Sequence, residues 1–153
     1  MSEHKPLKVF ASNRKANFKF KLLSKYEAGI QLLGSEVKSI REGNVNIKES
    51  YVKINKNELY VVGMHIGEYS HSGYSSHDVL REKKILLHKL EISKIIKEVS
   101  VKGKTIVPTK VYVKKGKIKL EISIAEGKKM WDKREDKKDQ DIQRRISRYK
   151  KGF

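Results

Sequence analysis

The residues best suited to acid–base chemistry in this sequence are one carboxylate and two imidazoles, Glu36, His65 and His88. A carboxylate paired with an imidazole can move protons near neutral pH. Both histidines, however, lie within apolar runs, GMHI and ILLHK, where a histidine more often belongs to the core or its boundary. The chain also has no cysteine, no GxSxG motif and no glycine-rich phosphate loop. The sequence therefore predicts no enzyme activity, no metal site and no cofactor.

The second chemical feature is a large excess of cationic side chains. The 153 residues include 36 lysines and arginines against 18 aspartates and glutamates, which gives a formal charge of +18. The resulting field attracts a polyanion, which could be nucleic acid, an anionic membrane or an acidic protein. The sequence has no run of about 18 apolar residues, and its N-terminus lacks the apolar stretch of a signal peptide. The charge therefore favours a nucleic-acid partner and a cytoplasmic location.

Patterns of period two predict the strands that would position these cations. In the run 18–33, Phe18, Phe20 and Leu22 alternate with lysines, so one strand face is apolar and the other basic. The β-rich runs 45–54 and 58–66 are separated by NKN, which is typical of a hairpin. The runs 105–115 and 117–125 meet at Gly116, and the second alternates strictly between isoleucine or leucine and polar residues.

Patterns near period 3.6 predict two short helices. The segment 34–43, GSEVKSIREG, places apolar residues three apart after Ser35, which could cap a helix. The segment 86–99 has apolar residues near helical spacing, and 67–78 reads as an exposed loop. Five or six strands with two or three short helices predict a mostly β protein, a small barrel similar to the oligonucleotide-binding (OB) fold. A ferredoxin-like α+β sheet is the alternative.

Composition divides the chain into three parts. Residues 1–12 have no periodic pattern and are expected to form a flexible leader, and residues 13–125 form the barrel. Residues 126–153 hold 11 basic and 6 acidic residues and few large apolar ones. Such a segment buries too little apolar surface to offset its ordering entropy, so we expect a basic tail that is disordered alone and helical when docked.

Eight segments, in order, resemble the SsrA-binding protein family, also called small protein B. They are NRKA (13–16), YEAGI (26–30), GSEVKSIREG (34–43), ESYV (49–52), GMHI (63–66), ILLHKLEI (85–92), VPTKVYVKKGKIKLEI (107–122) and AEGKKMWDKRED (125–136). The resemblance covers nearly the whole chain.

The resemblance implies a bacterial RNA-binding protein of trans-translation, not an enzyme. Such a protein binds the tRNA-like domain of transfer-messenger RNA (SsrA RNA, or tmRNA) with its barrel. Together with elongation factor Tu and GTP, which join through the RNA, it brings tmRNA to stalled ribosomes. Its tail enters the messenger channel beside the decoding centre. A monomer is expected, and a non-specific basic nucleic-acid-binding protein is the alternative.

The resemblance also implies the residues at the tmRNA interface. They are Asn13, Arg14, Lys15, Phe18, Glu27, Leu86 and Lys119. Residues 13–15 could donate to phosphates or form a solvated basic leader. Phe18 could stack on a base or join the core, and Glu27 could accept from RNA donors or pair with a lysine. Leu86 could also be a core residue, whereas Lys119 lies on the polar face of its strand.

The tail residues implied at the ribosome are mostly cationic. They are Gly127, Lys128, Lys129, Trp131, Asp132, Lys133, Arg134, Lys137, Lys138, Arg144 and Arg145. The cations could bind ribosomal RNA phosphates, and Asp132 could cap a helix that forms on docking. Trp131 could stack on a base or pack on the barrel.

Overall fold

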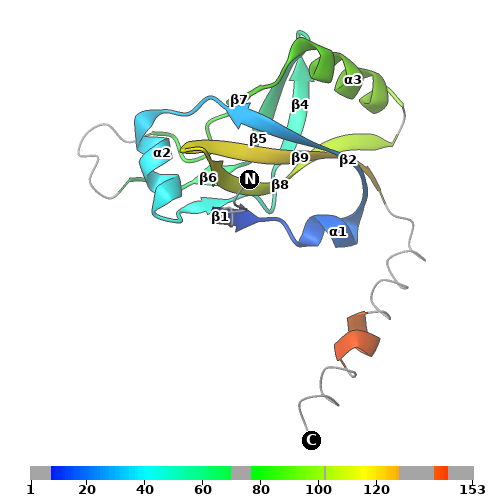
Figure 1. Ribbon diagram of the computed structural model, residues 1–153, viewed down its shortest axis with the longest axis horizontal. Helices are drawn as coiled ribbons and strands as arrows, with labels where there is room; N and C mark the ends of the chain where they lie inside the picture. Colours follow the sequence, from blue (N-terminus) through cyan, green and yellow to red (C-terminus); the bar gives the residue numbers. More distant parts are fainter. Residues whose placement is uncertain (1–7, 70–76, 102, 128–139, 145–153) are drawn as a thin grey trace, which may run out of the picture.

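A computed structural model describes residues 8–69, 77–101, 103–127 and 140–144 of the chain (Figure 1). Within these residues β-strands predominate. Seven strands form the main sheet: β1 (Lys8–Ser12), β2 (Phe20–Ile30), β4 (Tyr51–Asn55), β5 (Glu58–Val62), β7 (Lys83–Leu86), β8 (Lys104–Lys114) and β9 (Lys117–Gly127). Two short strands, β3 (Val45–Asn46) and β6 (His65–Ile66), pair with each other. The helices are α1 (Lys15–Lys19), α2 (Gly34–Arg41) and α3 (Lys89–Val99), and residues 140–144 are also helical.

The main sheet curls into a nearly closed antiparallel ring. Its strands follow the order β8–β4–β5–β7–β2–β9, and β9 returns to pair with β8, while β1 is added to the edge of β8. Bulges in β2 between Leu22 and Lys25 and in β8 between Pro108 and Lys110 let these strands bend. The structure thus confirms a mostly β, barrel-like fold, and the ferredoxin-like alternative does not hold.

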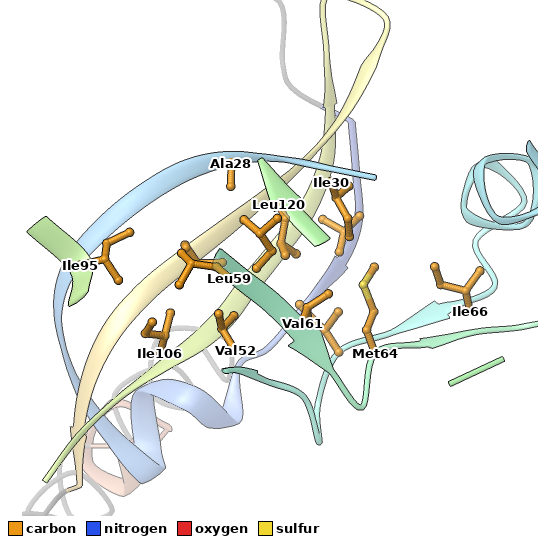
Figure 2. Close-up of a cluster of buried hydrophobic side chains, with 14 of the residues drawn as sticks. Ala28, Ile30, Val52, Leu59, Val61, Met64, Ile66, Ile95, Ile106 and Leu120 are labelled. Atoms are coloured by element: carbon orange, nitrogen blue, oxygen red, sulfur yellow. The ribbon is translucent and has the colours of Figure 1, made fainter. Parts of the chain in front are cut away.

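Alternation along the strands places aliphatic side chains inside the ring. Figure 2 shows Ala28, Val52, Leu59, Ile106 and Leu120 directed toward one another, and each is at most 5% exposed. At roughly 1.5–3 kcal/mol for each large aliphatic side chain, this burial is the main favourable contribution to folding. On the outside of the ring a smaller apolar cluster, with Ala16 and Phe20 among its members, holds α1 against β8 and β9.

Local turn chemistry accounts for the two hairpins that the sequence predicts. Lys56 and Asn57 have φ angles of 51° and 61° between β4 and β5, and Lys115 and Gly116 have 51° and 75° between β8 and β9. Positive φ at both central residues matches the twist of the flanking strands. Both hairpins are confirmed, with the registers Val52↔Val61 and Val111↔Leu120.

Three predicted elements need correction. Residues 8–12 are strand β1 rather than leader, because they pair with β8, from Lys8↔Val113 to Ser12↔Lys110. Phe18 lies in helix α1, so the predicted strand begins at Phe20. The predicted helix 86–99 begins at Lys89, because Leu86 is the last residue of strand β7 and His88 is the N-cap of the helix.

The short helix α2 is confirmed, but Ser35 does not cap it. The Glu36 side chain accepts the backbone N–H of Leu33 at 2.7 Å and so closes the first turn. Ser35 lies inside the helix, and its hydroxyl contacts Nδ1 of His77 at 2.8 Å. Most of the predicted loop 67–78 lies outside the described residues, although His77 is buried. No helix among the described residues is long and apolar enough to cross a membrane.

Candidate nucleic-acid interface

Four residues form a row across four neighbouring strands on the outer face of the ring. In the antiparallel registers, Gly29 of β2 lies opposite Leu86 of β7 and opposite Lys119 of β9. Lys119 in turn lies opposite Tyr112 of β8. Paired residues point to the same side of a sheet, so Leu86, Lys119 and Tyr112 share this face. The row brings together two of the residues that the sequence predicted for RNA binding.

Leu86 is 49% exposed, so the alternative that it belongs to the core is wrong. Its strand neighbours explain why. Ile85 points into the ring and is 1% exposed, which forces the next side chain outward. Gly29 lies beside it, and a Cβ atom there would be 3.3 Å from Cβ of Leu86. Because Gly29 has no side chain, the sheet surface beside Leu86 is not covered at this point.

Glu27 is two residues before Gly29 and therefore on the same outer face. The Tyr112 hydroxyl donates to its Oε2 at 2.7 Å, and Nζ of Lys114 lies 3.2 Å from the same oxygen. The hydrogen bond from Tyr112 holds the pKa of Glu27 below its ordinary value, while partial burial opposes this and Lys114 assists it. Burial and the bond to Glu27 raise the pKa of Tyr112. The predicted alternative of a lysine ion pair is thus present, and it holds an ionised acceptor on the surface.

The other predicted contacts form a second group at the start of β2. Arg14 and Lys15 are exposed at the N-terminus of α1, and Phe18 is 38% exposed and belongs to neither core cluster. From Phe20 to Glu27 the strand rises roughly 20 Å at about 3.3 Å per residue. The structure therefore brings the predicted residues together as two groups, not as one.

Asn13 differs from the other predicted contacts because it is 8% exposed. Its Nδ2 lies 3.4 Å from the carbonyl oxygens of Ile47 and Pro108, and its backbone N–H donates to Thr109 at 2.8 Å. Its side chain is used to fix the corner between β1 and α1, which orients the two cations that follow. The expectation that its amide donors bracket phosphates is not supported by this position.

Tyr112 and Lys114 are functional candidates that the sequence reasoning missed. The signal was present, because Lys110, Tyr112 and Lys114 alternate with valines in 110–114. That alternation puts all three on one strand face. It could not show that this face meets Glu27, which is 85 positions from Tyr112 in the chain.

The residues considered for acid–base chemistry are not brought together. Glu36 is fully buried beside Arg81, at 2.6 Å, and Lys83, at 3.9 Å. His65 and His88 are exposed, so the expectation that they belong to the core or its boundary is wrong. His65 faces solvent from β6, next to a buried residue of the same strand. His88 faces solvent as the N-cap residue of helix α3.

Of the predicted tail residues, the structure describes two. Gly127 is the last residue of β9, so the barrel extends two residues beyond the predicted boundary at 125. Arg144 is exposed in the helical stretch 140–144. The others, Lys128, Lys129, Trp131, Asp132, Lys133, Arg134, Lys137, Lys138 and Arg145, lie outside the described residues.

A nearly closed antiparallel ring, a charge of +18 and an outer face with an ionised acceptor, an aliphatic side chain and cations define a small β-barrel nucleic-acid-binding protein. The model of the SmpB protein family matches residues 10–152. The chain belongs to the SmpB protein family.

Similar proteins agree with this assignment. The SsrA-binding protein of Persephonella marina is 47% identical over 146 residues, which cover 95% of this chain and 96% of that protein. The SsrA-binding protein of Syntrophobacter fumaroxidans is 40% identical over 156 residues, covering 99% and 97%. A solved structure described as "tmRNA-SmpB: a journey to the center of the bacterial ribosome" matches with a TM-score of 0.66 and 38% identity, covering 82% of this chain and 87% of that one.

Proposed function

We propose that this chain binds SsrA RNA, the transfer-messenger RNA, and acts with it on the ribosome in trans-translation. Family membership and the full-length similarity to SsrA-binding proteins support this function. The observation that carries it is the outer face on which Glu27, Leu86 and Lys119 lie within two residues of one register row. Members of this family bind RNA without catalysing a reaction, so the protein is not an enzyme.

The chemistry of this face suits RNA. An ionised carboxylate accepts hydrogen bonds from base amino groups and from the ribose 2′-hydroxyl, which DNA lacks. An exposed aliphatic side chain can lie against a base, and a lysine can bind a phosphate. In the second group of predicted contacts, at helix α1, we propose that Arg14 and Lys15 bind phosphates and that Phe18 stacks on a base.

The central test is the affinity for tmRNA against an unrelated structured RNA of equal length, titrated over a range of salt. Phosphate contacts alone lose affinity steeply with salt and do not distinguish sequences or shapes. A preference for tmRNA that persists as salt rises supports the proposed function. Equal and equally salt-sensitive binding of both RNAs would return the protein to the non-specific alternative.

The Tyr112→Phe variant is expected to raise the pKa of Glu27, because it removes the hydrogen bond that most stabilises the carboxylate. Glu27 then becomes protonated at a higher pH as the solution is acidified, and tmRNA affinity begins to fall at that higher pH. The measurement is an NMR titration of the Glu27 carboxyl carbon, together with binding as a function of pH. Tyr51→Phe, at an exposed tyrosine of β4, is the matched control. An unchanged Glu27 titration in Tyr112→Phe would contradict the prediction.

We further propose that the predicted tail 126–153, of which Glu126 and Gly127 belong to β9, acts on the ribosome through the residues that follow the barrel. Their cations, with Trp131 and Asp132, suit ribosomal RNA in the messenger channel and at the decoding centre. Residues 140–144 are helical in the free chain, so the expectation that the tail is disordered alone does not hold for this stretch. We expect the tail to be helical when docked, and we expect elongation factor Tu with GTP to join through the RNA. A monomer in the cytoplasm, where ribosomes translate, fits these roles.

Deletion from Trp131 onward is expected to leave tmRNA affinity within about twofold of the full chain, since both groups of barrel contacts remain. Tagging of nascent chains on stalled ribosomes should be lost. A filter-binding assay and a reconstituted tagging assay measure the two effects separately. A collapse of RNA affinity would show that the tail is part of the RNA site.

A further inference from the structure

A cavity of about 450 Å³ opens directly beside the outer-face row. It is bounded by the end of β2, helix α2, the end of β7 and the turn between β8 and β9. Its apolar wall is formed by Ile30, Leu32, Val37, Leu86 and Ile118. Leu86 is thus shared between the proposed RNA-binding face and the cavity, and so is Lys119.

Cations surround this apolar wall. Arg41 comes from α2, and Lys117 and Lys119 come from β9. Among the ion pairs of the described residues, none involves these three side chains. The Arg41 guanidinium donates to the carbonyl oxygen of Gly116 at 3.3 Å, which links α2 to the β8–β9 turn and restrains the guanidinium plane. Positive charge at this rim is therefore available to an anionic ligand.

A flat apolar group with an attached negative charge would match both parts of the cavity. A nucleotide has this composition, because its base is flat and largely apolar on both faces and its phosphate is anionic. Bases that leave the stack bind proteins by lying against apolar side chains or guanidinium planes. The volume also falls within the range of sites that hold small organic ligands, roughly 300–1,000 Å³.

We propose that this cavity receives one unstacked nucleotide of the RNA bound along the neighbouring row. The base lies against Val37 and Leu86 and beside the Arg41 guanidinium, and its phosphates meet Lys117 and Lys119. This inference rests on the proposed RNA-binding function and adds to it a binding site for a single unpaired nucleotide. The cavity is continuous with the proposed RNA-binding face, because Lys119 lines both. An RNA backbone bound to Lys119 would therefore lie at the rim of the cavity.

The test is chemical probing of full-length tmRNA with and without the full-length protein. Dimethyl sulfate reports adenine and cytosine, and a carbodiimide reports guanine and uracil. The wild-type protein is expected to protect one base that is reactive in free tmRNA. Val37→Phe fills the cavity and should restore the reactivity of that base, with about a tenfold loss of affinity, while the other protections remain.

Arg41→Gln is the second variant, because Arg41 is exposed and its replacement leaves the core intact. It should also restore reactivity at the same base. Lys94→Gln is its control, since it removes one cation from α3, which contributes no residue to this cavity. Circular dichroism checks that each variant is folded.

The outcomes distinguish failure of the nucleotide site from failure of the proposed tmRNA-binding function. Equal wild-type affinity for tmRNA and for an unrelated RNA would overturn the proposed function itself. Specific wild-type binding, with the same protections in Val37→Phe and Arg41→Gln, would overturn only the proposal that the cavity binds a nucleotide. Reactivity that returns equally in Lys94→Gln would also overturn it, because the effect would then be one of general charge.

Discussion

The Glu36→Ala variant should lower the free energy of unfolding by about 3–5 kcal/mol, because it leaves a buried cation without its carboxylate. Glu36 and Lys83 are both fully buried, and Arg81 lies 2.6 Å from the same carboxylate. Nζ of Lys83 also donates to the carbonyl oxygens of Arg81 at 2.6 Å and Met64 at 3.1 Å. The substitution removes the acceptor for the Leu33 N–H as well.

The loss should be greater at pH 6 than at pH 9. Burial lowers the pKa of Lys83 to about 8, although the nearby Glu36 carboxylate opposes this shift. Because the folded-state pKa lies below that of a free lysine, protonated Lys83 costs folding free energy below pH 8, and Glu36 reduces that cost. Above pH 8 Lys83 is mainly neutral in the folded state, and the carboxylate matters less.

Urea unfolding at the two pH values measures both effects. Glu82→Ala is the matched control, because Glu82 pairs with Lys53 at 2.9 Å with both side chains exposed. Its removal should cost less than about 1 kcal/mol. Equal losses for the two variants, or a loss at position 36 that does not change between pH 6 and pH 9, would refute this account of the buried cluster.

The Leu86→Glu variant should weaken tmRNA binding about 100-fold at moderate salt. It removes an apolar contact worth roughly 1–3 kcal/mol and places a carboxylate among phosphates. Because Leu86 is 49% exposed and its strand neighbours face inward, the variant should fold normally. Isothermal titration calorimetry with tmRNA measures the affinity.

Leu90→Glu makes the same chemical change on α3, where Leu90 is 78% exposed. It should bind tmRNA within about threefold of the wild type, since it changes net charge equally but lies off the row. If the two variants lost affinity equally, the effect would be that of net charge. Binding of Leu86→Glu at wild-type strength would place the RNA on another face of the ring.

Features set by neighbouring residues could be predicted from the sequence. The two hairpins follow from turn residues that accept positive φ, and β9 follows from strict alternation over 117–124. Helix α2 follows from its apolar spacing and flanking glycines. In each case the determining signal lies within about ten residues, as secondary-structure reasoning requires.

Features set by distant residues could not be predicted. Phe18 continues a convincing strand pattern, yet Ala16 of the same segment packs against β8 and β9 and the segment turns into α1. Glu36 is charged, and only the arrival of Arg81 and Lys83 makes its burial tolerable. Family resemblance supplied Glu27, but its bond to Tyr112 depends on the register of three strands.

The way β8 and β9 complete the ring has a consequence for how the protein is made. A chain is synthesised from its N-terminus, so β2, β4, β5 and β7 are available before the last two strands exist. Phe20 at the start of β2 pairs with Gly127 at the end of β9, and Val52 of β4 pairs with Ile106 of β8. The free edge of β4 stays unpaired until β8, which ends at Lys114, has been made, and the free edge of β2 is not fully paired until β9 ends at Gly127. Such unpaired edges invite aggregation. An incomplete copy of this protein therefore cannot close its barrel, and its own folding depends on translation that reaches the end of the barrel.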